Sequence, residues 1–204
     1  MSARHVLILG AGGLGREVFH WALDAGMEPL GFIDDNAEAL RDRPGYPPIL
    51  GGVATASLRA PVLCAIGRND LRRRCVEALT ARGATFASLL HPQAKCLRAT
   101  LGPGAIVAPF AYVAADAEAG PFAFLQTGAV LGHDVRAGAF LRMDTTAFVG
   151  GYARLGDNVT LHTGAKVMPG KTVGDDCTLG AGAILLSNLR PGRTAFGNPA
   201  VAAP

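Results

Sequence analysis

The clearest pattern in the chain is an apolar residue at every sixth position from residue 101 to residue 185. The positions are Leu101, Val107, Val113, Ala119, Leu125, Leu131, Ala137, Met143, Val149, Leu155, Leu161, Val167, Val173, Leu179 and Leu185. Two residues before each of them stands a small or modest side chain, most often alanine, and glycine often follows. Lys171 is the one clear break in the second series.

A period of six residues is typical of a three-sided solenoid, in which each repeat supplies one short strand and one turn. The aliphatic residue fills the interior, the small residue packs beside it, and glycine suits the tight turn. At about 18 residues per coil, the segment from Leu101 to Leu189 gives about five coils. We therefore expect an all-β parallel β-helix in residues 91–204.

Residues 1–90 follow a different pattern, in which short apolar strands alternate with helices. Strands are predicted over residues 5–9, 29–33 and 61–66, and helices over residues 16–25 and 69–82. This alternation predicts a small α/β unit with a parallel sheet of the Rossmann type.

A glycine-rich turn, Gly10-Ala11-Gly12-Gly13-Leu14-Gly15, lies between the first predicted strand and the first predicted helix. Its G-x-G-x-x-G spacing lets backbone amides and a helix N-terminus face a phosphate. Asp34 and Asp35 follow about 20 residues later, where a carboxylate suits a ribose hydroxyl or a base edge. The unit is predicted to bind a nucleotide, with structural glycines as the alternative.

Composition narrows the partners and the setting of the protein. The net charge is +3, and the arginine triplet at residues 72–74 is too short to indicate nucleic acid binding. No stretch approaches the ~20 apolar residues that span a bilayer, and the N-terminus lacks a signal peptide pattern. The scattered cysteines indicate reduced thiols, with neither a disulfide nor a metal site. We expect a cytoplasmic protein that binds no membrane.

The whole chain resembles the sugar acetyltransferases of the sialic acid O-acetyltransferase type, which include nucleotide-sugar N-acetyltransferases of bacillosamine and perosamine pathways. The resemblance rests on the glycine-rich turn, Asp34-Asp35 and the hexapeptide repeats. The other motifs that carry it are Ile66-Gly67-Arg68-Asn69, His91-Pro92, His133-Asp134 and Gly197-Asn198-Pro199-Ala200. It implies a half-Rossmann unit followed by a left-handed parallel β-helix that forms a homotrimer, with acetyl-CoA bound between subunits.

The same resemblance implies where the substrates bind. The N-terminal unit is expected to hold a nucleotide-sugar, with Asp34 and Asp35 near the base. The residues expected near its phosphates or sugar are Gly12, Gly13, Leu14 and Gly67. By position, the candidates for binding acetyl-CoA are Arg142, His162, Thr163, Gly180 and Ala181.

Three positions depart from the family pattern. Leu14 and Arg142 stand where related proteins often carry histidines near the sugar and the donor. Val201 stands where a lysine is common.

His133 is the candidate general base. It lies two residues after an interior position, so it is expected in a turn, with the carboxylate of Asp134 beside it. Attack of an amine on a thioester needs a group that takes the proton, and a positioned base contributes about 10²–10⁴-fold. The oxyanion needs donors, for which backbone N–H groups of the turns are the simplest source. No cysteine lies near His133 in the repeat register, which favours direct attack in a ternary complex.

The leading hypothesis is therefore transfer of an acetyl group to the amine of a nucleotide-linked amino sugar. A second hypothesis is O-acetylation of sialic acid or a related sugar hydroxyl, which uses almost the same chemistry. A non-catalytic solenoid scaffold would lack activity with any acceptor. A nicotinamide-dependent oxidoreductase would have to bind NAD, although the N-terminal unit is too short for the two halves of a dinucleotide domain.

Overall fold

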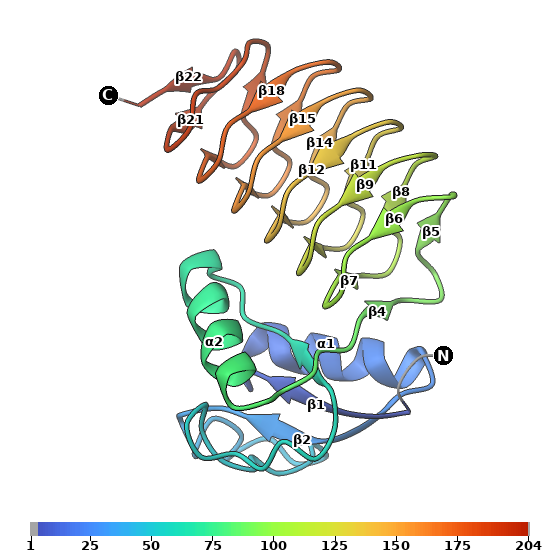
Figure 1. Cartoon of the computed structure of the whole chain (residues 1–204), viewed down its shortest axis with the longest axis vertical. Coiled ribbons are helices and arrows are strands. Elements are labelled where there is room, and N and C mark those ends of the chain that lie inside the picture. The colour runs from blue at the N-terminus through green and yellow to red at the C-terminus, as the bar shows by residue number, and fades with distance from the viewer. Residues whose placement is uncertain (1–3, 204) are drawn as a thin grey trace. The chain divides into compact units, whose positions relative to one another are not determined.

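A computed structural model describes residues 4–203 of the chain, which divide into two compact units. One unit ends at His91 and the other begins at Pro92. Figure 1 shows an α/β unit in the first part of the chain and a stack of short strands in the second. Among the described residues, no helix is long and apolar enough to cross a membrane.

The first unit is built on a three-stranded parallel sheet with the order β2-β1-β3. Its elements are β1 His5–Leu9, α1 Gly13–Asp24, β2 Glu28–Ile33, β3 Val62–Cys64, α2 Asn69–Ala81 and β4 Leu89–Leu90. Residues Val6 to Leu9 of the central strand are almost completely buried. Central parallel strands that are covered on both faces are apolar throughout, as β1 is. The predicted small parallel sheet is confirmed.

Helix α1 begins at Gly13, three residues before the predicted start at Arg16. Gly12 is its N-cap residue with an extended backbone, and the Arg16 N–H donates to the Gly12 oxygen at 3.1 Å. The first helical turn therefore lies inside the glycine-rich segment, whose low helix propensity hid it from the sequence pattern. Its amide groups lie where the sheet meets the helix, which is the place expected for a phosphate site.

The second unit is a parallel β-solenoid made of very short strands. They are β5 Lys95–Cys96, β6 Thr100–Leu101, β7 Ile106–Val107, β8 Tyr112–Val113, β9 Glu118–Ala119, β10 Phe124–Leu125, β11 Val130–Leu131, β12 Arg136–Ala137, β13 Arg142–Met143, β14 Phe148–Val149, β15 Arg154–Leu155, β16 Thr160–Leu161, β17 Lys166–Val167, β18 Thr172–Val173, β19 Thr178–Leu179, β20 Ile184–Leu185, β21 Thr194–Phe196 and β22 Val201–Ala202. Every third strand pairs in parallel, and only the terminal pair β21–β22 is antiparallel.

Three sheets form the three sides of the solenoid. We name each by its middle strand: the β13 sheet (from β7 to β22), the β14 sheet (β20-β17-β14-β11-β8-β5) and the β12 sheet (β18-β15-β12-β9-β6). The chain passes from the β13 sheet to the β14 sheet and then to the β12 sheet in every coil. A residue therefore occupies a corner, and the same corner recurs one coil later.

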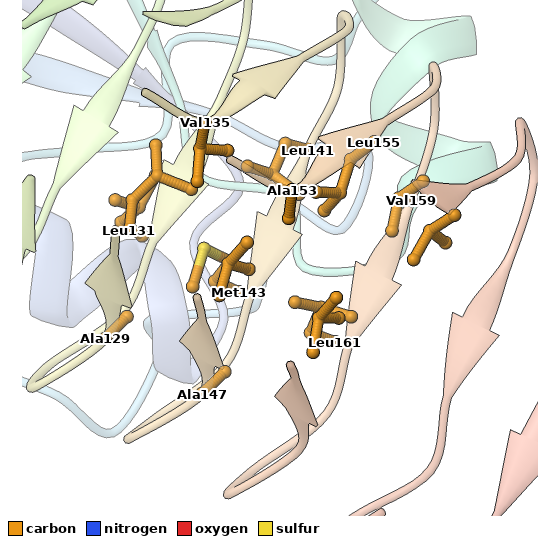
Figure 2. Close-up of a cluster of buried hydrophobic side chains, with 14 of the residues drawn as sticks. Ala129, Leu131, Val135, Leu141, Met143, Ala147, Ala153, Leu155, Val159 and Leu161 are labelled. Carbon is orange, nitrogen blue, oxygen red and sulfur yellow. The ribbon is translucent and has the colours of Figure 1, made fainter. Parts of the chain in front are cut away.

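The repeat positions fill the interior as predicted. Figure 2 shows Leu131, Met143, Leu155 and Leu161 inside the coils, with the second series, such as Ala147, beside them. Most members of both series are completely buried, while Leu101 and Ala137 are only half-buried. Because each strand is two residues long, one side chain faces inward and the other outward.

The solenoid has about 6 turns, more than the five expected. It begins at β5, before the first repeat position at Leu101. Cys96 pairs with Val113, 17 residues later, whereas Leu101 pairs with Ala119, 18 residues later. This coil is one residue short, so a strict step of six back from Leu101 meets Lys95 and misses the first coil.

The corner between the β14 and β12 sheets turns through residues with positive φ. Asp134 has φ 56° and Tyr152, one coil later, has φ 61°. The Tyr152 N–H donates to the His133 oxygen at 3.0 Å, and the Asp134 N–H donates to the Ala115 oxygen at 3.1 Å. These hydrogen bonds stack successive corners at a fixed spacing, so side chains 18 or 19 residues apart become neighbours.

Candidate active site

His133 and Asp134 form a hydrogen-bonded pair in the turn between β11 and β12. The imidazole Nδ1 lies 2.9 Å from Asp134 Oδ2, and the side chains are 55% and 39% exposed. The left-handed backbone at Asp134 turns the chain so that its carboxylate reaches the preceding ring. The structure thus brings together the two residues predicted as base and orienting acid, and it leaves the ring accessible to a substrate.

Gly151, one coil later, lies directly against the imidazole. A Cβ atom added to Gly151 would lie 2.5 Å from His133 Nε2 and 2.6 Å from Cε1. Such a distance is far inside van der Waals contact, so only glycine leaves room for the ring in this position. The sequence analysis did not single out Gly151, although it follows His133 by 18 residues, one full coil.

The backbone of Gly151 offers a donor beside the base. Its oxygen accepts a hydrogen bond from the Gly170 N–H at 2.9 Å. Its own N–H donates to no acceptor within residues 4–203. A backbone N–H in such a position can stabilise negative charge that develops on a reacting oxygen.

Tyr152 packs on the other part of the His133 ring. The two ring centroids are 4.9 Å apart and the planes meet at 89°, an edge-to-face arrangement. Tyr152 is 59% exposed, so its ring also faces the space in front of the histidine.

A second polar cluster lies at the corner between the β13 and β14 sheets. Asp144 accepts hydrogen bonds from Arg142 Nε to Oδ1 at 2.7 Å, and its Oδ2 lies 2.9 Å from His162 Nδ1. The Asp144 side chain is only 16% exposed, so its charge is held between two partners that are more exposed. Charge-assisted hydrogen bonds of this kind fix side-chain orientation.

The sequence analysis named Arg142 and His162 but missed Asp144, which connects them. A usable signal was the register, since Asp144 follows Met143 as His162 follows Leu161, one coil apart. Gly180 occupies the same register in the next coil, and its N–H donates to the Ala195 oxygen at 2.9 Å. Thr163 and Ala181 are the residues that follow His162 and Gly180 in these turns. The predicted donor-binding residues therefore follow one corner of the solenoid.

The two clusters occupy different corners of one chain. His133 follows β11, at the edge of the β14 sheet next to the β12 sheet. His162 follows β16, at the edge of the β14 sheet next to the β13 sheet. The β14 sheet thus lies between the candidate base and the candidate donor-binding residues.

The first unit contains a cleft of about 370 Å³ beside the glycine-rich turn. Its lining includes the predicted residues Gly12, Gly13, Leu14, Asp34 and Gly67, together with Gly10, Gly15, Ala65, Ile66, Arg68 and Leu71. The first turns of α1 and α2 both contribute to it. Two helix N-termini at one cleft favour a phosphate group.

The two predicted carboxylates have different surroundings. Asp34 lies in the cleft, where its Oδ2 accepts the Ala11 N–H at 2.7 Å and its Oδ1 accepts the Asn36 N–H at 2.9 Å. Asp35 is not part of the cleft lining, and its Oδ1 accepts the Val53 N–H at 2.8 Å. Both side chains therefore hold loops of the unit in place, and Asp34 shapes the glycine-rich turn itself.

Arg68 places a positive charge at the rim of the same cleft. It donates to both carboxylate oxygens of Asp70, at 3.2 and 2.7 Å, and this pairing lowers the pKa of the Asp70 carboxyl. On the neighbouring strand, burial raises the pKa of the Cys64 thiol to about 12, so this cysteine stays protonated at neutral pH. Within residues 4–203, no group of three or more histidine, cysteine, aspartate or glutamate side chains could hold a metal ion.

Comparison with known proteins identifies the family. The profile of the PglD N-terminal domain matches residues 5–79. The acetyltransferase domain of PglB from Neisseria gonorrhoeae is 30% identical, with 98% of this chain and 100% of that chain covered and a TM-score of 0.88. This chain belongs to the hexapeptide-repeat sugar acetyltransferases. A comparison with curated proteins gives no significant match.

Other solved members of the family carry ligands. A second structure of the PglB domain is in complex with acetyl coenzyme A, with 30% identity, coverage of 98% and 99%, and a TM-score of 0.89. PerB from Caulobacter crescentus, in complex with CoA and GDP-perosamine, is 27% identical over the full length of both chains, with a TM-score of 0.87. The predicted family and fold class are confirmed.

Proposed function

We propose that this chain transfers an acetyl group from acetyl-CoA to the amine of a nucleotide-linked amino sugar, with His133 as the general base. The observation that carries the proposal is the geometry at His133, where an accessible imidazole is held by a carboxylate and lies against a backbone donor. The acetyl-CoA and GDP-perosamine complexes of the related proteins support both substrate classes.

The hydrogen bond at His133 determines which nitrogen acts as base. With Asp134 accepting the Nδ1 proton, Nε2 carries the lone pair, and Nε2 is the atom that lies against Gly151. The acceptor amine attacks the thioester carbon while Nε2 takes a proton from the nitrogen. The C–S bond then breaks, CoA leaves as thiolate and the imidazolium returns the proton to it.

Gly151 supplies the second element of the proposed chemistry. Its N–H is a backbone donor beside Nε2, where the carbonyl oxygen of the thioester gains negative charge during attack. A preformed donor of this kind lowers the barrier because it need not reorient during the reaction. No covalent acyl-enzyme is required.

The donor and acceptor are assigned to the remaining sites. Arg142 and His162, held by Asp144, are proposed to line the acetyl-CoA groove, with Thr163, Gly180 and Ala181 supplying further contacts. The cleft of the first unit is proposed to hold the nucleotide-sugar, with its phosphates facing the first turns of α1 and α2. Asp34 acts there by shaping the glycine-rich turn.

The outer face of the β14 sheet supports a homotrimer. Four of its outward residues are apolar and at least partly exposed: Tyr112, Val130, Phe148 and Ile184. The outward residues of the β12 sheet are instead polar: Thr100, Glu118, Arg136, Arg154 and Thr172. An apolar face favours packing against another copy. The two corners that flank it carry the candidate base and donor-binding residues, so packing here would bring one subunit's base toward another's donor groove. A single-chain sedimentation mass would contradict this assembly.

The substrate test measures acetyl-CoA consumption with UDP-, dTDP- and GDP-linked 4-amino sugars and with free sialic acid. Turnover of one nucleotide amino sugar, lost in His133→Ala and kept in the surface control His20→Ala, is the expected result. Turnover with sialic acid alone would replace the proposal with O-acetylation. Inactivity with every acceptor, in protein that binds acetyl-CoA, would overturn the amino-sugar assignment.

A further inference from the structure

We infer that Tyr152 is a positioning residue that holds the His133 imidazole in its reactive orientation. The inference rests on the proposed role of His133 as base. Its starting point is the edge-to-face contact between the two rings, at 4.9 Å and 89°. Tyr152 is one coil later than Asp134 in the same corner, so the solenoid backbone fixes its place beside the histidine.

The backbone of Tyr152 gives independent support. It has φ 61°, a left-handed conformation that is unfavourable for a bulky side chain. The equivalent corner positions before and after it are Asp134 and Gly170, residue types that tolerate this conformation more readily. A bulky residue that keeps an unfavourable backbone and remains 59% exposed indicates a function for its side chain.

Another aromatic pair of the solenoid shows how a ring at such a corner is used. Phe140, with φ 57°, stacks on Phe122 of the preceding coil at a centroid distance of 5.1 Å. Tyr152 packs in the same way on the preceding coil, but the ring that it meets there is the imidazole. The corner geometry therefore directs an aromatic side chain toward the coil before it, and at Tyr152 that coil carries the base.

His133 needs such support because its side chain is 55% exposed. Asp134 restrains the ring through Nδ1, and a single hydrogen bond still allows rotation about that contact. Contact with the Tyr152 ring restricts the imidazole plane, so that Nε2 stays at Gly151. An edge-to-face pair of this kind corresponds to an effect of about 3- to 10-fold on the population of the held orientation.

The test compares Tyr152→Phe, Tyr152→Ala and the control Phe140→Ala by steady-state kinetics. Tyr152→Phe should keep kcat, and Tyr152→Ala should lower kcat about 3- to 10-fold with the KM of both substrates within twofold. Phe140→Ala removes a ring contact at another corner and should leave kcat unchanged. An unchanged kcat in Tyr152→Ala, or an equal loss in Tyr152→Phe, would overturn the inference.

A double variant separates this inference from the assignment of the base. If Tyr152 acts through His133, adding Tyr152→Ala to His133→Ala should cause no further loss of kcat. An additive loss would show that Tyr152 acts directly on substrate. Full activity of His133→Ala would instead remove the proposed function, and it would do so whatever the Tyr152 variants show.

Discussion

Replacing Gly151 with alanine tests the geometry of the candidate base without changing any ionisable group. The added Cβ would lie 2.5 Å from His133 Nε2, whereas ordinary contact begins near 3.4 Å. The imidazole must therefore move by at least 0.9 Å, which is 3.4 minus 2.5 Å. The methyl group would also occupy space beside the nitrogen that is proposed to take the proton.

A displacement of about 1 Å at a reacting group can lower the rate about 10²-fold. This loss corresponds to about 2.7 kcal/mol of transition-state stabilisation. Folding should be little affected, because Gly151 lies outside the left-handed region and a compatible Gly→Ala change stabilises by about 0.4–1 kcal/mol. We expect Gly151→Ala to keep its melting temperature within a few degrees and to lose about 10²-fold in kcat.

The assay follows release of the CoA thiol with the active acceptor, beside thermal unfolding of the same samples. The matched control is His133→Ala with and without Gly151→Ala, since the alanine fits once the ring is gone. Within that pair kcat should not change further. A Gly151→Ala enzyme with kcat within threefold of the parent would refute the placement of the ring at the reaction centre.

Three further predictions concern single side chains. Asp134→Asn keeps a residue suited to the left-handed turn but removes the carboxylate at His133, so kcat should fall about 10- to 100-fold at unchanged stability, as measured by steady-state kinetics and thermal unfolding. Asp144→Asn should raise the KM for acetyl-CoA several-fold with a smaller effect on kcat, because His162 loses its charged partner; an unchanged KM would contradict this. The Cys64 pKa rises from 9.0 to about 12 on folding, so the free energy of unfolding should fall as the pH rises from 9 toward 12, and denaturant titrations of Cys64→Ala should show a smaller decrease.

Most of the fold could be predicted because its physical rule is local and repeated. A period of six with one buried position leaves a single architecture, and residues such as Leu131 and Leu161 are buried where the period places them. The prediction was wrong only where the rule is interrupted, at the short coil before Leu101. The start of α1 also escaped it, because Gly13 and Leu14 form a helical turn in a glycine-rich segment.

The site was only partly predictable, because its neighbours lie one coil apart rather than adjacent in sequence. His133 and Asp134 are consecutive, and their pairing follows from the turn. Gly151 and Tyr152 approach the same ring from the next coil. Their role depends on hydrogen bonds between corners, which the hydrophobic period does not encode.

Asp144 shows the same limit at the second corner. It has no distinguishing local motif, and its importance comes from lying between Arg142 and His162. Asp35 shows the reverse case, since a motif that is typical of base or ribose binding places this carboxylate on the Val53 amide, outside the cleft lining.

The most direct test of the account is the single-turnover rate of acetyl transfer from acetyl-CoA to the active nucleotide amino sugar, measured for the parent enzyme and for His133→Ala. The account predicts that the variant binds both substrates with unchanged affinity and transfers acetyl about 10²–10⁴-fold more slowly. A transfer rate within tenfold of the parent, at saturating substrates, would contradict the assignment of His133 as the general base.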